Sequence, residues 1–185
     1  MKRRTWLMAG TGAAAAALGV AWQLRGQRSP ATAEPVAAAA SQPDDATGAA
    51  AFWQMSFDRP EGGTLAMASL RGRPLLLNFW GTWCPPCVKE MPELDQFARQ
   101  FGAAGWQVLG LAVDNPKAVR EFLARTPVSY TIALAGFEGS ELTRQLGNTQ
   151  SGLPFTVAFN RQGAVFQRKA GASTLAELAA WAKTM

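Results

Sequence analysis

The sequence predicts an α/β domain over residues 51–185, in which short buried strands alternate with helices. Residues 74–80 (Pro-Leu-Leu-Leu-Asn-Phe-Trp) are almost wholly apolar, as expected of a central strand that is buried on both faces. Between residues 85 and 101, apolar side chains recur every three or four positions, which is the period of one helix face: Val88, Met91, Leu94, Phe97 and Phe101. A buried strand that leads directly into an amphipathic helix is typical of α/β domains.

The other elements follow from the same patterns. Residues 52–57 and 64–69 are predicted to pair as strands around Glu61-Gly62-Gly63, because turn residues separate two apolar runs. A second hairpin is predicted around Arg161-Gln162-Gly163. The remaining predicted elements are a strand at 106–113, a helix at 116–124, a strand at 130–134, a helix at 140–146 and a last helix at 174–183, with Ser173 as its N-cap.

The N-terminus has the layout of an export signal. Met1-Lys2-Arg3-Arg4 precedes a weakly apolar run at residues 5–22. Arg3-Arg4-Thr5-Trp6-Leu7 also resembles a twin-arginine signal, and Ala31-Thr32-Ala33 is a candidate cleavage site. An uncleaved membrane anchor is the alternative, because the run is near the minimum length of a membrane span.

These features predict three regions. Residues 1–28 are expected to be an export signal or an N-terminal membrane anchor. Residues 29–50, which are rich in Ala and Pro and have no apolar periodicity, are expected to be a flexible linker. The α/β domain then occupies residues 51–185.

The composition excludes several classes of function. The chain has 185 residues, a formal charge of +5 and no long basic run, so we expect no nucleic-acid partner. It contains no histidine, which removes Ser-His-Asp and Cys-His catalysis as well as histidine-ligated haem and the usual zinc enzyme sites. Its two cysteines alone do not complete a structural zinc site. We therefore expect no metal and no cofactor, and a joint role for the two cysteines.

The cysteines lie in a segment that resembles a known family. Residues 78–90 (Asn-Phe-Trp-Gly-Thr-Trp-Cys-Pro-Pro-Cys-Val-Lys-Glu) are similar to the active site of the exported thioredoxin-like reductases of the TlpA and ResA type. The resemblance continues through the predicted strand and helix order to residues 152–156 (Gly-Leu-Pro-Phe-Thr). It implies a thioredoxin fold, with a central mixed β-sheet flanked by helices and an N-terminal β-hairpin extension, and a thiol–disulfide oxidoreductase activity.

Cys84 and Cys87 are the predicted redox-active pair. Cys84 opens the helix, whose free amides and partial positive charge favour a thiolate, so it is the expected nucleophile. Cys87, one turn further along, is expected to resolve the mixed disulfide. The alternative is a structural disulfide or two inert thiols, but a three-residue spacing closes too small a loop to stabilise the fold much.

Five residues around the pair are expected to bind substrate. Pro154 matches the family's proline whose preceding peptide bond is cis, and such a bond would expose the backbone of Leu153 to an extended substrate segment. The alternative for Pro154 is an ordinary trans proline at the start of a strand. Trp83, Pro85 and Pro86 complete the expected docking surface.

Glu90 is the acid predicted to assist the thiols. It follows Cys87 by three residues on nearly the same helix face and coincides with an acid that tunes thiol titration in ResA-type reductases. A partly buried carboxylate there would accept the proton of Cys87 during resolution. The alternative is a solvated acid that favours the first turns of a helix. Thioredoxins have a buried Asp where this chain has Asn78, and Asn cannot act as a base.

Electron flow is predicted to run toward reduction of the substrate. Pro85 and Pro86 lack amide hydrogens, so the helix start offers few donors to a Cys84 thiolate, whereas a strong oxidant needs its reduced form stabilised. A thiol oxidase that forms disulfides is the alternative. A metal-binding chaperone of the same fold is disfavoured. Such proteins have a Cys-x-x-x-Cys motif and a distant His, whereas this chain has the shorter Cys-x-x-Cys spacing and no histidine.

The resemblance also implies partners and a location. The expected partners are substrate proteins that contain disulfides, with apocytochrome c as a candidate, and a membrane thiol electron donor of the CcdA/DsbD type. The expected location is the periplasm, where the protein is either free or tethered to the inner membrane through residues 5–22.

Overall fold

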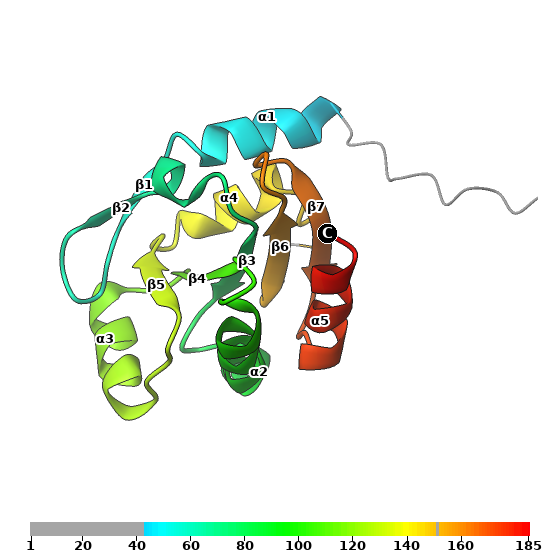
Figure 1. Ribbon diagram of the computed structural model, residues 1–185. Helices are drawn as coiled ribbons and strands as arrows, with labels where there is room; N and C mark the ends of the chain where they lie inside the picture. Colours follow the sequence, from blue (N-terminus) through cyan, green and yellow to red (C-terminus); the bar gives the residue numbers. More distant parts are fainter. Residues whose placement is uncertain (1–42, 151) are drawn as a thin grey trace, which may run out of the picture. The chain divides into compact units, whose positions relative to one another are not determined.

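The computed structural model describes residues 43–150 and 152–185, which fold around one mixed β-sheet (Figure 1). In this part of the chain its seven strands run in the order β2-β1-β5-β4-β3-β6-β7. The elements in chain order are α1 (Pro43–Phe52), β1 (Ser56–Asp58), β2 (Thr64–Ala66), the 3-10 helix η1 (Met67–Leu70), β3 (Leu75–Trp80), α2 (Pro85–Phe101), β4 (Gln107–Ala112), α3 (Pro116–Arg125), β5 (Thr131–Leu134), α4 (Gly139–Gln145), β6 (Phe155–Phe159), β7 (Val165–Ala170) and α5 (Leu175–Lys183).

The predicted central strand is β3, which lies between β4 and β6 in the sheet. β3 pairs in parallel with β4 and antiparallel with β6, so that Asn78 lies between Gly110 and Thr156. All six residues of β3 are buried, which agrees with their apolar run. The mixed sheet, the flanking helices and the β1–β2 hairpin confirm the predicted thioredoxin fold.

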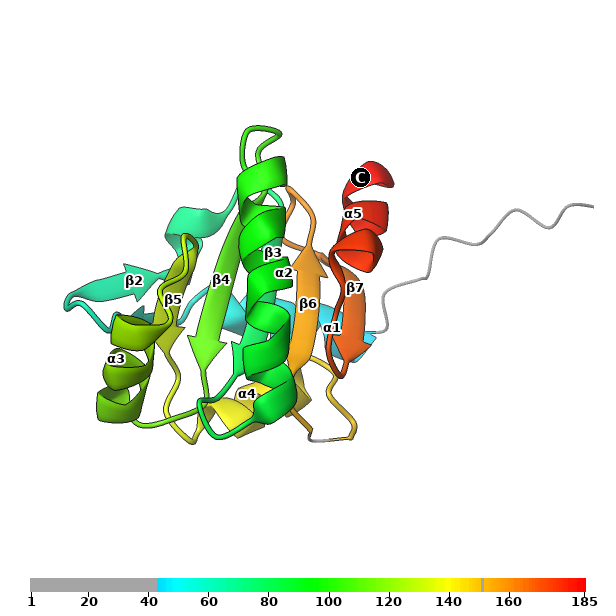
Figure 2. The same cartoon turned by 90° about the horizontal axis from the view of Figure 1, so that it is seen from below.

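Helices cover both faces of the sheet (Figures 1 and 2). α1 and α4 lie on one face, and α2, α3 and α5 lie on the other. The side chains of β3 alternate between the two apolar clusters: Leu77 and Phe79 point toward α1 and α4, while Trp80 joins the cluster that contains Cys84 and Cys87. Because β3 and β4 are parallel, their carboxyl ends meet at one edge of the sheet, and α2 begins at that edge.

The predicted linker ends earlier than residue 50. Residues 43–52 form the helix α1, and Ala49, Phe52 and Trp53 are buried in the core. Trp53 also donates a hydrogen bond from Nε1 to the carbonyl of Gly163 at 2.7 Å. The Ala-rich segment has too weak an apolar pattern to indicate a helix, and its burial against distant residues stabilises it instead.

The predictions for residues 1–28 and for residues 29–42 of the linker lie outside the described residues. Within residues 43–150 and 152–185, no helix is long and apolar enough to cross a membrane.

Three further details differ from the predictions. The second strand, β2, ends at Ala66 rather than at residue 69, because Met67–Leu70 form η1. The first strand begins at Ser56 rather than at residue 52, because Phe52 belongs to α1. Thr174, not Ser173, is the N-cap of α5: its hydroxyl accepts from the amide of Glu177, and the Glu177 carboxylate accepts from the amide of Thr174. Ser173 is therefore not the cap. It is buried, and its amide donates a hydrogen bond to Glu90 of α2.

Candidate active site

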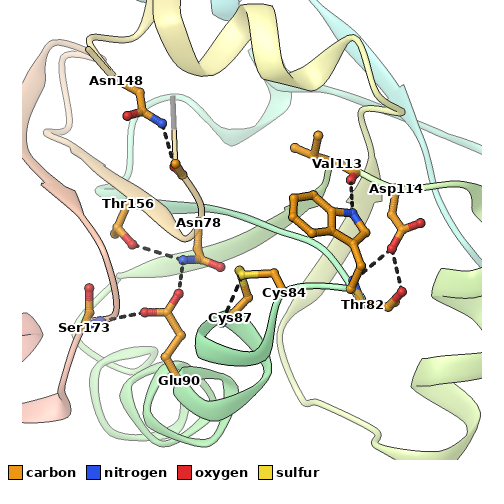
Figure 3. The surroundings of a disulfide bond; sticks show 12 residues. Asn78, Thr82, Cys84, Cys87, Glu90, Val113, Asp114, Asn148, Thr156 and Ser173 are labelled. Atoms are coloured by element: carbon orange, nitrogen blue, oxygen red, sulfur yellow. Dashed lines mark hydrogen bonds between the residues drawn. A yellow bond between two sulfur atoms is a disulfide. The ribbon is translucent and has the colours of Figure 1, made fainter. Parts of the chain in front are cut away.

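Cys84 and Cys87 form a disulfide at the N-terminus of α2 (Figure 3). Cys84 is the N-cap residue, and its Sγ accepts a hydrogen bond from the amide of Cys87 at 3.3 Å. Cys84 is 4% exposed and Cys87 is 0% exposed. Pro85 and Pro86 occupy the intervening positions, where they are exposed and supply no amide hydrogen. Both cysteines are thus buried, but Cys84 keeps a small exposed fraction and Cys87 has none.

Asp114 fixes the loop that precedes Cys84. This residue is 2% exposed and follows β4 at the edge of the sheet where α2 begins. Its Oδ2 accepts hydrogen bonds from the amide of Thr82 at 2.9 Å and from the hydroxyl of Thr82 at 2.6 Å. Its Oδ1 accepts from the amide of Asn115 at 2.7 Å and from the side chain of Asn115 at 3.3 Å. Asp114 was not among the residues predicted for the site, although an acid directly after a predicted buried strand indicates a position at this edge of the sheet.

Two tryptophans border the pair in different ways. Trp83 is 58% exposed and donates from Nε1 to the carbonyl of Val113 at 3.1 Å. A Cβ atom on Gly81 would lie 2.7 Å from the Trp83 Nε1 atom, so the indole can occupy this place because residue 81 has no side chain. Trp80 is fully buried and packs with the cysteines and with Phe122.

Glu90 lies in a buried polar network on the other side of the disulfide (Figure 3). Its Oε1 accepts from Nδ2 of Asn78 at 2.7 Å, and its Oε2 accepts from the amide of Ser173 at 2.6 Å. Nδ2 of Asn78 also donates to the hydroxyl of Thr156 at 3.1 Å. Glu90 is only 2% exposed, so it is not the solvated helix acid of the alternative prediction.

Burial raises the pKa of Glu90 from 4.5 to about 7, because the carboxylate loses its water. The hydrogen bonds from Ser173 and Asn78 and the positive charge of Lys169 on β7 lower the pKa of Glu90 and so oppose part of this shift. A carboxyl group with this pKa gains or loses its proton near neutral pH.

The peptide bond between Leu153 and Pro154 is cis, as the resemblance predicted. Phe155 follows directly and pairs with Phe79 near the carboxyl end of β3, so Pro154 lies at the edge of the sheet where α2 begins. The side chain of Asn148 is buried and donates from Nδ2 to the carbonyl of Gly152 at 2.8 Å. This hydrogen bond holds the segment that leads into the cis bond.

Residues 43–180 match the model of the family described as Redoxin. The chain belongs to the Redoxin family. Among curated relatives of this Redoxin chain, the thiol-disulfide oxidoreductase ResA of Bacillus thuringiensis subsp. konkukian is 29% identical over 124 residues, which cover 66% of this chain and 69% of that relative. ResA of Bacillus subtilis is 31% identical over 116 residues, which cover 61% of this chain and 62% of that relative.

Solved structures of similar proteins agree with this family. A thiol:disulfide interchange protein of the thioredoxin family from Chlorobium tepidum TLS is 26% identical with a TM-score of 0.60, and the match covers 70% of this chain and 91% of that one. The MTB dsbF structure is 26% identical with a TM-score of 0.62, and the match covers 72% of this chain and 96% of that one. This Redoxin chain is therefore a thiol–disulfide oxidoreductase of the ResA type with a Cys-x-x-Cys pair.

Proposed function

We propose that this chain reduces disulfides of exported proteins, with Cys84 as the attacking sulfur and Cys87 as the resolving sulfur. The observation that carries the proposal is the unequal position of the two cysteines at the start of α2. Cys84 keeps a small exposed fraction at the start of the helix, whereas Cys87 is fully buried one turn further along. An incoming substrate disulfide therefore meets Cys84 first.

The reaction transfers two electrons from the dithiol to the substrate. The Cys84 thiolate attacks one sulfur of the substrate disulfide, forms a mixed disulfide and releases the other sulfur as a thiolate that takes up a proton. Cys87 then loses its proton, and its thiolate attacks the sulfur of Cys84. This step closes the Cys84–Cys87 disulfide and releases the second substrate thiolate, which also takes up a proton.

Glu90 is the proposed acceptor of the Cys87 proton. It follows Cys87 on the same helix, and its carboxylate is buried beside β3 and β6. A base is most effective when its pKa lies near the working pH, and burial raises the pKa of Glu90 to about 7. Asn78, which occupies the position of the thioredoxin Asp, has no titratable group.

The direction of electron flow follows from the donors that reach Cys84. Of the first three residues of α2, only Cys87 has an amide hydrogen, and it donates to the Cys84 sulfur at 3.3 Å. A thiolate that receives so few hydrogen bonds is weakly stabilised. A pair with a weakly stabilised reduced form gives up its electrons readily.

Substrate is proposed to dock on the exposed residues around Cys84. Trp83, Pro85 and Pro86 are exposed, and together they supply an apolar surface beside the reactive sulfur. Leu153 is half-buried and precedes the cis bond at the same edge of the sheet. Its backbone is the proposed partner of an extended substrate segment.

An exported location fits the N-terminal charge pattern, with residues 1–28 as the proposed signal or anchor and residues 29–42 as the proposed linker. A structural relative from Mycobacterium tuberculosis is described as a secreted disulfide oxidoreductase, at 22% identity and a TM-score of 0.61. In an oxidising compartment the pair needs a source of electrons, for which we propose a membrane thiol donor of the CcdA/DsbD type. Apocytochrome c, whose haem-attachment cysteines must be reduced, is the candidate substrate.

A redox titration of the Cys84–Cys87 pair tests the direction. A midpoint potential more negative than about −220 mV is expected, because reducing dithiols of this fold such as thioredoxin have potentials in that range. A value near about −120 mV belongs to a strong oxidant and contradicts the proposal.

Trapping tests the assignment of the two sulfurs. The Cys87→Ala variant is expected to accumulate mixed disulfides through Cys84, because nothing resolves them. The matched Cys84→Ala variant is expected to trap none. Mixed disulfides on Cys87 in the second variant would reverse the assignment.

A further inference from the structure

The amide of Asn78 is satisfied at one end only. Its Nδ2 donates to Glu90 and to Thr156, whereas its Oδ1 has no hydrogen-bond partner within the described part of the chain. Asn78 is 1% exposed, so bulk water does not reach this oxygen. An unpaired buried amide oxygen is unfavourable, and such an atom in a native network calls for an explanation.

The two charge states of Glu90 need opposite ends of this amide. A carboxylate only accepts hydrogen bonds, whereas a protonated carboxyl group also donates one. The hydroxyl of Thr156 either donates or accepts. The two ends of a carboxamide have nearly the same shape, so the partners determine which end faces them. With a proton on Oε1 of Glu90, a half-turn of Asn78 lets Oδ1 accept from both Glu90 and Thr156.

We propose that Asn78 is a positioning residue whose carboxamide turns over when Glu90 changes charge. Nδ2 faces the Glu90 carboxylate, and Oδ1 faces the protonated acid. During resolution the S–H bond of Cys87 breaks, an O–H bond forms on Glu90 Oε1, and Asn78 turns. The inference rests on the proposed function only for the source of this proton, which is Cys87.

After the half-turn, the amide of Asn78 also presents a hydrogen-bond donor to the cysteines. In Figure 3 the free oxygen of Asn78 faces the disulfide. After the half-turn, the Nδ2 group points to the side on which the Cys87 thiolate has formed. The N–H donors of Asn78 thus face whichever of the two groups carries the negative charge. An ionised Asp at this position has no donor and cannot act in this way.

Other charged and titratable groups near Glu90 have different partners. Lys169 on β7 lowers the pKa of Glu90 but is paired with Glu177 of α5. Glu93, one turn along α2, accepts from the amide of Leu175. Tyr130, which precedes β5, is buried, and this burial raises its pKa so that it stays neutral. Asn78 is therefore the contact of Glu90 that is able to exchange a donor for an acceptor.

The test uses the full chain in its disulfide form, in which no thiol titrates. Side-chain NOEs of Asn78 are followed by NMR together with the Glu90 carboxyl carbon from about pH 5 to about pH 9. At high pH the Asn78 amide hydrogens are expected near the γ hydrogens of Glu90. At low pH these cross-peaks are expected to vanish and to be replaced by cross-peaks to the β hydrogens of Cys87, with the same midpoint as the Glu90 carbon, near pH 7.

The Glu90→Gln variant sharpens the test. The amide of Ser173 can only donate, so the Gln oxygen must face Ser173 and its amino group must face Asn78. Asn78 is therefore expected to stay turned at every pH, with a complete loss of the pH-dependent NOE change. Glu93→Gln is the matched control on the same helix, and it is expected to behave as the unchanged chain does.

NOEs that stay constant while the Glu90 carbon titrates overturn the inference, as does a Glu90→Gln variant in which Asn78 still faces residue 90 with Nδ2. Failure of the proposed function has a different signature. If Cys87 passes its proton elsewhere, the pH profile of thiol reactivity in the reduced protein is the same in Glu90→Gln, while the NOE change in the disulfide form persists in the unchanged chain.

Discussion

Two buried carboxylates lie on opposite sides of the disulfide and differ in the hydrogen bonds that they accept (Figure 3). Asp114 and Glu90 are each 2% exposed. Asp114 accepts four hydrogen bonds, all from Thr82 and Asn115, and so holds the loop before Cys84. Glu90 accepts two, from Asn78 and Ser173, and its pKa is raised to about 7. Two equally buried carboxylates thus have different surroundings: Asp114 is held by four hydrogen bonds in a loop, whereas Glu90 has two and a raised pKa.

The largest expected effect is on the resolution step. In Glu90→Gln, we expect the rate at which Cys87 resolves a mixed disulfide at pH 7 to fall on the order of 10³-fold, because general-base assistance is lost. Rapid-mixing measurements of substrate thiol release check this rate. Asp114→Asn, the matched change on the other side, is expected to slow the same step by less than about tenfold, since Asp114 contacts the loop before Cys84 and not the cysteines. Equal slowing in the two variants would remove the distinction between the sides.

The difference between Glu90 and Asp114 is also tested by the pH dependence of the free energy of unfolding, measured on the disulfide form. Glu90 releases its proton near pH 4.5 in the unfolded chain and near pH 7 in the folded one, so the folded state binds more protons between these values. The free energy of unfolding is therefore expected to fall by about 3 kcal/mol as the pH rises through this range.

Denaturant unfolding at several pH values measures this change. The Glu90→Gln variant is expected to lack the decrease, whereas Glu93→Gln is expected to retain it. A decrease of the same size in Glu90→Gln would assign the titration to another group.

A smaller effect is expected at the fixed carboxylate. Asp114→Asn replaces one acceptor oxygen by an amino group that faces donors of Thr82 or Asn115, so we expect the free energy of unfolding to fall by about 2 kcal/mol. The slope of stability against pH should stay as it is in the unchanged chain, because Glu90 is intact. A loss below about 0.5 kcal/mol would show that the loop does not depend on Asp114.

The smallest effect is expected at the cap of α5. Thr174→Ala removes the hydroxyl that accepts from the Glu177 amide, which should lower the free energy of unfolding by about 1 kcal/mol. Glu90 contacts the backbone amide of Ser173 and not the Thr174 side chain, so its titration midpoint should not move. A shifted midpoint, measured from the Glu90 carboxyl carbon, would mean that the cap itself positions Glu90.

Local patterns predicted the part of the site that is close together in the sequence. The apolar run of β3, the helical period of α2 and the Cys-x-x-Cys spacing place the disulfide at the start of a helix, and the structure has them there. The two carboxylates, in contrast, contact residues that are far from them in the sequence. Thr82 and Asp114 are 32 positions apart, and Glu90 and Ser173 are 83 positions apart, so no local pattern joins them.

Two other differences have separate physical reasons. α1 was missed because its Ala-rich sequence has little amphipathic character, and packing of Phe52 and Trp53 against Phe159 stabilises it. The prediction that Ser173 caps α5 was wrong, although the sequence contains the pattern that identifies the correct cap. Glu177 stands three residues after Thr174, which is the capping-box spacing, and that pattern favours Thr174 over Ser173.

The long separation between Glu90 and Ser173 also has a consequence for the order in which the site is completed. A polypeptide is made from its N-terminus, so Cys84, Cys87 and Glu90 emerge from the ribosome well before β6, β7 and α5. Thr156, Lys169 and Ser173, which surround Glu90, all come from that later part. A nascent chain therefore contains the cysteine pair and Glu90 before the residues that bury Glu90, and the proposed proton transfer to Glu90 requires that these C-terminal residues have docked.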